Sequence, residues 1–208
     1  MEIIYRGAES IIYLDKYEGK KALVKERIKK GYRINEIDQK LRKERTRKEV
    51  NLLRRAREVG VFTPQVLHVD EKDHKIIMEF IDGIRIKEFL NSANEDEIKK
   101  VCFEIGRLIG KLHSNKIVHG DLTTSNMILK EGKIYFIDFS LGIFSNRIED
   151  YGVDLNLLYE ALKSTHFKIL KICWDSIVNG YKAEFKDSEK VFKKIEEIEK
   201  RARYMERN

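Results

Sequence analysis

The chain has 208 residues, of which 42% are apolar and 37% are charged, and its formal net charge is +7 at pH 7. This composition supports a folded core and excludes a disordered chain, while the length fits one large domain or two small lobes. No apolar run could span a bilayer, the N-terminus lacks the order of a secretory signal, and the two cysteines stand alone. We therefore expect a cytoplasmic protein with no membrane partner, no disulfide framework and no CxxC metal site.

Short runs rich in β-branched and aromatic residues, separated by turns, open the chain. From residue 35 to residue 59 there is neither Gly nor Pro, and the partial helical period predicts one long helix that ends before Gly60. Two further strands follow this helix. The predicted strands cover residues 2–5, 11–14, 22–26, 66–69 and 75–80.

After Asp82-Gly83 the pattern becomes helical, and Asn94 is the expected N-cap of a helix over residues 95–114. A loop and a hairpin are predicted between residues 117 and 138. The remaining predicted helices cover residues 153–162, 167–181 and 188–205. We expect an α+β fold in which Asp82-Gly83 joins an antiparallel β N-lobe with one long helix (residues 1–82) to a reduced helical C-lobe with a basic C-terminal tail (residues 83–208).

The strongest functional signal is the run from His119 to Asn126, which is followed by Ile137-Asp138-Phe139. The form H-x-D-x-x-x-x-N and a later Asp-Phe resemble the catalytic loop and metal-binding segment of protein-kinase-like phosphotransferases. In such a site Asp121 accepts the proton of the attacking hydroxyl, and Asn126 and Asp138 hold Mg²⁺. The competing interpretation is an ordinary hairpin with polar turn residues.

Lys25 is the candidate cation for the phosphates, because Ala22-Leu23-Val24-Lys25 resembles the V-A-I-K strand of kinases. The long helix offers an acidic ion-pair partner for it. We prefer Glu49, which lies in an apolar stretch midway along the helix, and keep Glu44 as the fallback.

A nucleotide-binding surface is predicted from two further segments. The run from Ile4 to Ile12 aligns with the Gly-rich loop of kinases, although only one of its three glycines is present. The run from Met78 to Ile81 is the expected hinge strand, whose backbone reads the adenine edge. The predicted nucleotide-contacting residues are Ile4, Gly7, Ala8, Glu9, Ser10, Ile12, Lys25, Glu49, Met78, Glu79, Phe80 and Ile81.

Taken together, several segments resemble the small atypical kinase subunit of the KEOPS (EKC) complex, which is related to the RIO and lipopolysaccharide kinases. The resemblance extends over nearly the whole chain. The segments that carry it are residues 7–10, 29–33, 45–49, 119–126 and 164–166. Two departures are Ser140, where the family usually has the Gly of Asp-Phe-Gly, and Ile34-Asn35, where it often has His-Pro.

The resemblance implies a minimal two-lobed serine/threonine kinase or ATPase that uses ATP and Mg²⁺. It also implies partners, namely the threonylcarbamoyl-transferring subunit, the other KEOPS subunits and tRNA, which is modified at adenosine 37. Between Lys16 and Arg57, 17 Lys or Arg residues stand against 6 Asp or Glu residues. We expect the long helix in this basic segment, including Arg42, Arg45 and Arg47, to contact tRNA together with the C-terminal tail at residues 200–205.

The chain lacks segments that kinases use to bind peptide substrates and to respond to activation-loop phosphorylation. Asp154, which resembles the buried Asp of the next kinase helix, follows Asp138 by only 16 positions, and no Ala-Pro-Glu lies between them. Gly120 replaces the Arg that reads a phosphorylated activation loop. Autophosphorylation or partner-linked ATP hydrolysis is therefore favoured over peptide phosphorylation. The alternatives are a small-molecule phosphotransferase of the aminoglycoside or choline kinase type, and a binding module without catalysis.

Overall fold

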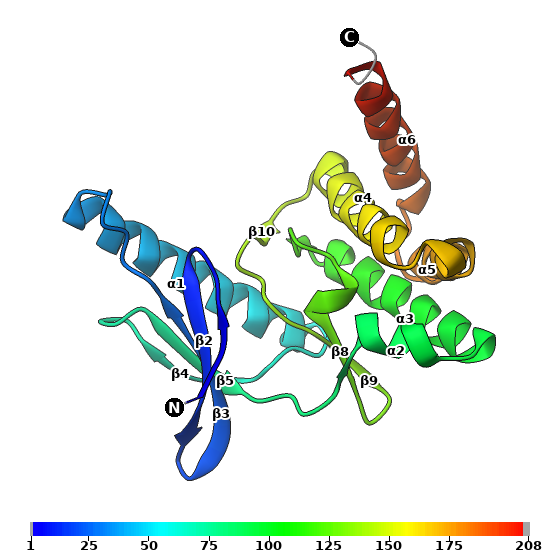
Figure 1. The fold of residues 1–208 in the computed structure, drawn as a ribbon. Coiled ribbons are helices and arrows are strands. Elements are labelled where there is room, and N and C mark those ends of the chain that lie inside the picture. The colour runs from blue at the N-terminus through cyan, green and yellow to red at the C-terminus, as the bar shows by residue number, and fades with distance from the viewer. Residues whose placement is uncertain (1, 206–208) are drawn as a thin grey trace.

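The computed structural model describes the backbone of residues 2–205 and the side chains of residues 2–198. An antiparallel sheet of five strands and one long helix form the N-terminal part, and helices dominate the rest (Figure 1). The strand order in this sheet is β1-β2-β3-β5-β4. Its strands are β1 (Glu2–Arg6), β2 (Ser10–Tyr17), β3 (Lys20–Arg27), β4 (Val66–Asp70) and β5 (Lys75–Glu79).

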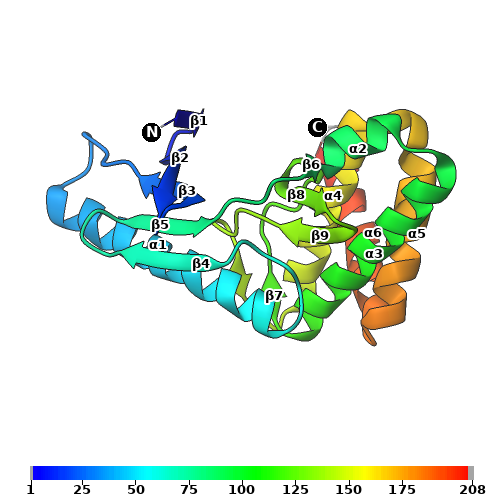
Figure 2. The same ribbon diagram turned by 90° about the horizontal axis from the view of Figure 1, so that it is seen from below.

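The long helix α1 (Asn35–Glu58) lies along one face of β4 and β5 (Figure 2). Its Val50 packs on Ile76 and Met78 of β5 and forms a small core beneath the sheet. The helix ends where predicted, because Gly60 adopts φ +81°, a conformation that glycine adopts without steric cost. This packing holds the middle of α1 against the sheet.

The C-terminal part begins with the short strand β6 (Ile84–Arg85), which pairs with β8 (Met127–Lys130); β8 in turn forms a hairpin with β9 (Lys133–Phe136). Its helices are α2 (Ile86–Ser92), α3 (Glu95–Ser114), α4 (Ile148–Thr165), α5 (Leu170–Glu184) and α6 (Ser188–Met205). The remaining short elements are β7 (Ile117–Val118), β8 (Met127–Lys130), β9 (Lys133–Phe136) and β10 (Ile143–Phe144). Within the described part of the chain, every helix is too short or too polar to cross a bilayer.

The main hydrophobic core lies among the C-terminal helices, but α1 also contributes to it. Leu52 and Leu53, near the end of α1, are buried in the same cluster as Leu112 of α3 and Leu158 of α4. The two parts are thus joined by shared apolar packing as well as by the connection through Asp82-Gly83. The division into residues 1–82 and 83–208 stays a prediction.

Most predicted elements are present, and the differences have local causes. Helix α3 has the predicted bounds, and Asn94 forms a capping box with Glu97. Helix α4 begins at Ile148, before the predicted residue 153, and the prediction missed this first part because Glu149, Asp150 and Gly152 interrupt the apolar period. The sequence analysis missed the seven-residue α2, and the predicted helix over 167–181 is a 3-10 turn followed by α5.

Helices α3 and α5 pack with their backbones in contact at two glycines. A Cβ atom built on Gly106 would overlap the carbonyl oxygen of Ile177, and one built on Gly180 would overlap that of Phe103. Both obstacles are backbone atoms, which cannot rotate away as a side chain does. The close approach of the two helices therefore depends on both glycines.

Replacing Gly180 with Ala is expected to lower the free energy of unfolding by at least about 3 kcal/mol, because the added methyl group must push α5 away from α3. For a chain of this size that change corresponds to a fall of roughly 6–12 °C in the thermal midpoint. Gly31→Ala is the matched control, since a Cβ there meets no atom within 4 Å. Equal midpoints for the two variants would contradict this account of the packing.

Candidate active site

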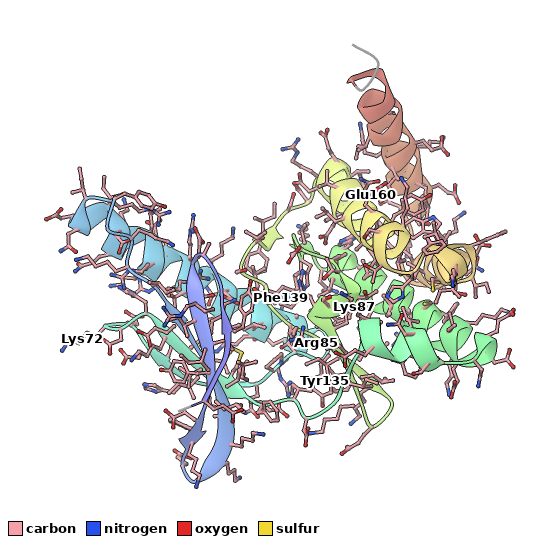
Figure 3. All side chains as sticks on the ribbon, in the orientation of Figure 1. Lys72, Arg85, Lys87, Tyr135, Phe139 and Glu160 are labelled. Atoms are coloured by element: carbon pink, nitrogen blue, oxygen red, sulfur yellow. The ribbon has the colours of Figure 1, made fainter. Side chains whose placement is uncertain are left out.

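A cavity of about 570 Å³ lies between the N-terminal sheet and the C-terminal part. Its walls come from β1 to β3, α1, the connection after β5, and the segment that contains β8 and β9. Figure 3 shows Arg85 and Phe139 between the sheet and the helices. Of the predicted site residues, Ile4, Ile12, Lys25, Glu49, Met78, Glu79, Phe80, Ile81, Asp121, Asn126 and Asp138 line the cavity.

Lys25 and Glu49 form the ion pair that the sequence led us to expect. Lys25 Nζ on β3 lies 2.7 Å from Glu49 Oε1 on α1, and both side chains are buried. The other carboxylate oxygen, Oε2, accepts a hydrogen bond of 2.6 Å from Nη2 of Arg27. Glu49 therefore holds two buried cations. The sequence analysis overlooked Arg27, although it stands two residues after Lys25 and so faces the same side of the strand.

Asp138 is the second acidic partner of Lys25. Its Oδ1 lies 2.7 Å from Lys25 Nζ and also accepts hydrogen bonds from the backbone N–H and the hydroxyl of Ser140. Burial alone would raise the pKa of Asp138, but the ammonium of Lys25 and these hydrogen bonds outweigh it and lower the pKa to about 2. The carboxyl group is therefore ionised at neutral pH. Ser140, the departure from Asp-Phe-Gly, holds its orientation.

Asn126 and Asp121 are joined directly. The amide nitrogen Nδ2 of Asn126 donates to Asp121 Oδ2 at 2.7 Å and to the Asp121 carbonyl oxygen at 3.0 Å. Because the nitrogen is used in this way, the amide oxygen Oδ1 of Asn126 is left to serve as a ligand. Arg85, which sequence analysis missed, supports the same loop by donating to the carbonyl oxygen of Ser125 at 2.6 Å.

The loop that carries Asp121 is held by buried polar groups. Asp154 accepts hydrogen bonds of 2.8 Å from the backbone N–H groups of His119 and Gly120. His119 donates from Nε2 to the Ile137 carbonyl oxygen and accepts the Asp121 N–H at Nδ1, so both ring nitrogens are occupied. Burial lowers the pKa of His119, which keeps the ring neutral. These contacts make His119 a support for the loop.

Close backbone packing explains why position 120 is a glycine. Its φ is +81°, and a Cβ atom there would lie 2.5 Å from the carbonyl oxygen of Leu141. Any larger residue would therefore separate the loop from the segment after Asp138. The carbonyl group of Leu141 occupies the space that a side chain at position 120 would need.

The donors available for a metal ion are the carboxylate of Asp138 and the amide oxygen of Asn126. Among the described residues there is no group of three or more His, Cys, Asp or Glu side chains suited to a metal ion. Two oxygen donors fit Mg²⁺, which usually binds one or two protein oxygens, several waters and the phosphates of a nucleotide. This donor set suits an ion that binds together with a nucleotide.

Four of the predicted nucleotide-contacting residues do not line the cavity, namely Gly7, Ala8, Glu9 and Ser10. They form a turn closed by a hydrogen bond of 2.9 Å from the Gly7 N–H to the Ser10 carbonyl oxygen. The carboxylate of Glu9 is paired with Arg33 and Arg45. These long-range pairs hold Glu9 beside the start of α1, and no local sequence pattern reveals them.

The run from Met78 to Ile81 lines the cavity, and its role as the hinge stays a prediction. The backbone N–H of Glu79 donates to the carbonyl oxygen of Gln65 at 2.8 Å, so it is not available to an adenine edge. The backbone N–H of Ile81, in contrast, donates no hydrogen bond to any described residue. Ile81 is thus the better candidate for backbone contact with a base.

Comparison with known proteins agrees with this geometry. The family model described as "RIO domain" matches residues 12–145. RIO domains are atypical kinases, so the fold is the expected two-lobed kinase-like α+β fold and the chain is an enzyme of the kinase or ATPase type, a class that uses ATP and Mg²⁺.

Full-length relatives narrow the family. The chain is 52% identical to "KEOPS complex subunit Bud32" of Pyrococcus abyssi, over 100% of this chain and 98% of that protein. It is also 44% identical to a "Probable bifunctional tRNA threonylcarbamoyladenosine biosynthesis protein" from Methanosarcina mazei and to one from Methanothermobacter thermautotrophicus, matching 98% of this chain but 36% of each relative. The chain therefore belongs to the RIO domain family and, within it, to the family of Bud32 subunits.

Proposed function

We propose that the chain is an ATP-dependent atypical serine/threonine kinase or ATPase that supports the formation of threonylcarbamoyladenosine in tRNA as a subunit of a KEOPS complex. The observation that carries the catalytic part is the meeting of Lys25, Asp121, Asn126 and Asp138 around one cavity. The biological part is supported by the 52% identity to a KEOPS subunit and by the names of the bifunctional relatives. Cytoplasmic location is part of the same proposal.

The proposed chemistry follows from the contacts in the cavity. Lys25, whose charge is retained by Glu49 and Asp138, donates hydrogen bonds to the phosphates of ATP. Asp121 accepts the proton of the attacking hydroxyl or water, and the amide of Asn126 keeps the Asp121 carboxylate oriented. Asp138 and Asn126 would hold Mg²⁺, which would supply positive charge to the phosphates when bound.

The other residues around the cavity support a proposal for how adenine binds and which kind of group accepts the phosphoryl group. Ile4 and Ile12 provide apolar contact for adenine, and the backbone of Ile81 provides a hydrogen bond. Only residues 139–147 separate Asp138 from the start of α4, and they include the short strand β10. This segment is too short for a peptide-binding platform, which favours hydrolysis or autophosphorylation.

The activity is tested by measuring ATP turnover by the chain alone, with the threonylcarbamoyl-transferring partner, and with the partner and tRNA. We expect turnover to rise when the partner is added and to be insensitive to small amino alcohols. Turnover that depends only on a small alcohol would instead identify a small-molecule phosphotransferase. No binding of ATP would identify a scaffold without catalysis.

The basic helix needs a different test from the one that the sequence suggests. Arg42, Arg45 and Arg47 each pair with a carboxylate, namely those of Asp38, Glu9 and Glu71. Reversing their charge would therefore break these ion pairs as well as any contact with RNA. The side chains of the basic tail at residues 200–205 lie outside the described part of the chain, so their role stays a prediction.

Lys48 and Arg54 are better probes, because both are exposed on α1 and form no ion pair with any described residue. Charge reversal at both is expected to weaken the association of tRNA with the assembled complex. It should also reduce the slope of log association constant against log salt by about 2, if each contacts one phosphate. Salt-dependent binding measurements check this, and an unchanged slope would remove this face of α1 from the tRNA surface.

A further inference from the structure

A separate pocket, with a free volume of only about 10 Å³ while Glu9 is in place, lies between Glu9 of the Gly7–Ser10 turn and the first half of α1. Five cationic side chains surround it. Its charged lining consists of Arg27, Lys30, Arg33, Arg42, Arg45 and the carboxylate of Glu9.

Part of this positive charge is neutralised from beneath. Asp38, which is fully buried, lies 2.7 Å from Arg42 and 3.8 Å from Arg33. Arg27 is paired with Glu49. The remaining acid, Glu9, is the only carboxylate that lines the pocket among the residues the structure describes. It pairs with Arg45, and it lies 3.7 Å from Arg33.

Glu9 behaves as an internal anion in this pocket. Hydrogen bonding by Arg45 holds the pKa of Glu9 below its usual range, so the group is ionised at neutral pH. Its side chain is nevertheless 45% exposed and is carried by a turn at the edge of the sheet. A carboxylate in such a position can leave without uncovering the core.

Arg27 supplies an independent sign that the pocket is built for a larger anion. Its side chain is only 4% exposed, and its Nε–H is buried with no hydrogen-bond partner. A buried donor without an acceptor is unfavourable, and Glu9 does not satisfy it. A tetrahedral anion has more acceptor oxygens than a carboxylate and can bridge Arg27 and Arg45 at once.

We propose that this pocket is an anion site that accepts a phosphate group, from free phosphate or from an RNA backbone, in place of the carboxylate of Glu9. When the phosphate binds, Glu9 and the Gly7–Ser10 turn are released from α1. The site lies outside the ATP cavity and does not require the proposed function, because it depends on the arginines alone.

The experiment uses the full chain labelled with ¹⁵N, titrated with inorganic phosphate at constant ionic strength, and follows the Nε–H signal of Arg27 by NMR. The expected result is a saturable shift of this signal. Glu9→Gln, which removes the competing charge, is expected to lower the dissociation constant about tenfold. Arg45→Gln is expected to raise it by a similar factor.

Glu71→Gln is the matched control. Glu71 is also an exposed carboxylate paired with an arginine of α1, but it lies outside the pocket, so phosphate affinity should not change. A second arm replaces phosphate by a single-stranded oligoribonucleotide without a terminal phosphate. A shift of Arg27 that is lost in Arg45→Gln identifies the RNA backbone as a source, and a response to inorganic phosphate alone identifies the free anion.

The proposal is overturned if neither probe moves the Arg27 Nε–H signal, or if Glu9→Gln and Glu71→Gln change phosphate affinity equally. The second result would mean that the anion responds to net charge and not to this pocket. Because no readout uses ATP turnover, failure here leaves the proposed kinase or ATPase activity untouched.

Discussion

Asp121→Asn is expected to lower ATP turnover roughly 1,000-fold, because a positioned general base typically contributes factors of 10² to 10⁴. The substitution keeps the shape of the side chain but removes its ability to take a proton. Affinity for ATP should stay within about threefold, since the proposed phosphate and metal contacts come from Lys25, Asn126 and Asp138. Steady-state kinetics together with calorimetric titration of ATP separate the two effects.

The control for this variant is Asp175→Asn, an exposed carboxylate on α5 that pairs with Lys171 far from the cavity. It should leave turnover unchanged. If Asp121→Asn retained more than about a tenth of the wild-type rate, Asp121 would not be the general base. The role of the loop would then be limited to holding the nucleotide.

Glu49→Gln is also expected to destabilise the fold strongly, by about 3 kcal/mol of unfolding free energy. Glu49 is 1% exposed and is the carboxylate shared by Lys25 and Arg27. Loss of its charge leaves Arg27 buried with no anionic partner among the described residues, while Lys25 keeps Asp138. Replacing one member of a buried ion pair costs far more than the pair contributes, because the remaining charge cannot return to water.

Glu44→Gln tests whether this cost comes from burial. Glu44 stands on the same helix, but its side chain is 60% exposed and lies 4.0 Å from Lys40. Its unfolding free energy should remain within about 0.5 kcal/mol of the wild type. Chemical denaturation of both variants measures the difference, and equal losses would show that Glu49 does not act as the buried anion of this network.

Much of the fold and the center of the candidate site follow from local patterns. The likeness of Ala22-Leu23-Val24-Lys25 to the V-A-I-K strand marked Lys25, the apolar stretch around Glu49 favoured it as the partner of Lys25, and Asn94 marked the start of α3. These features depend on residues that are close in sequence. Such spacing is visible in the chain before it folds.

Features that depend on distant contacts could not be predicted in this way. Glu9 was predicted to line the cavity, but it lies outside it and pairs with Arg45, which is 36 residues away in the sequence. Gly180 is required by a carbonyl group on another helix, and Arg85 supports a loop 40 residues further along the chain. In each case one partner belongs to an element whose position is set only by the packing of the whole molecule.

We propose that the cavity between the sheet and the helices holds ATP and Mg²⁺ through Lys25, Asn126 and Asp138. A crystal structure of the chain with Mg²⁺ and a non-hydrolysable ATP analogue tests it most directly. We predict phosphate oxygens at Lys25 Nζ, and Mg²⁺ bound by Asp138 and by the amide oxygen of Asn126. A nucleotide bound elsewhere, or a metal ion with neither of these ligands, would contradict it.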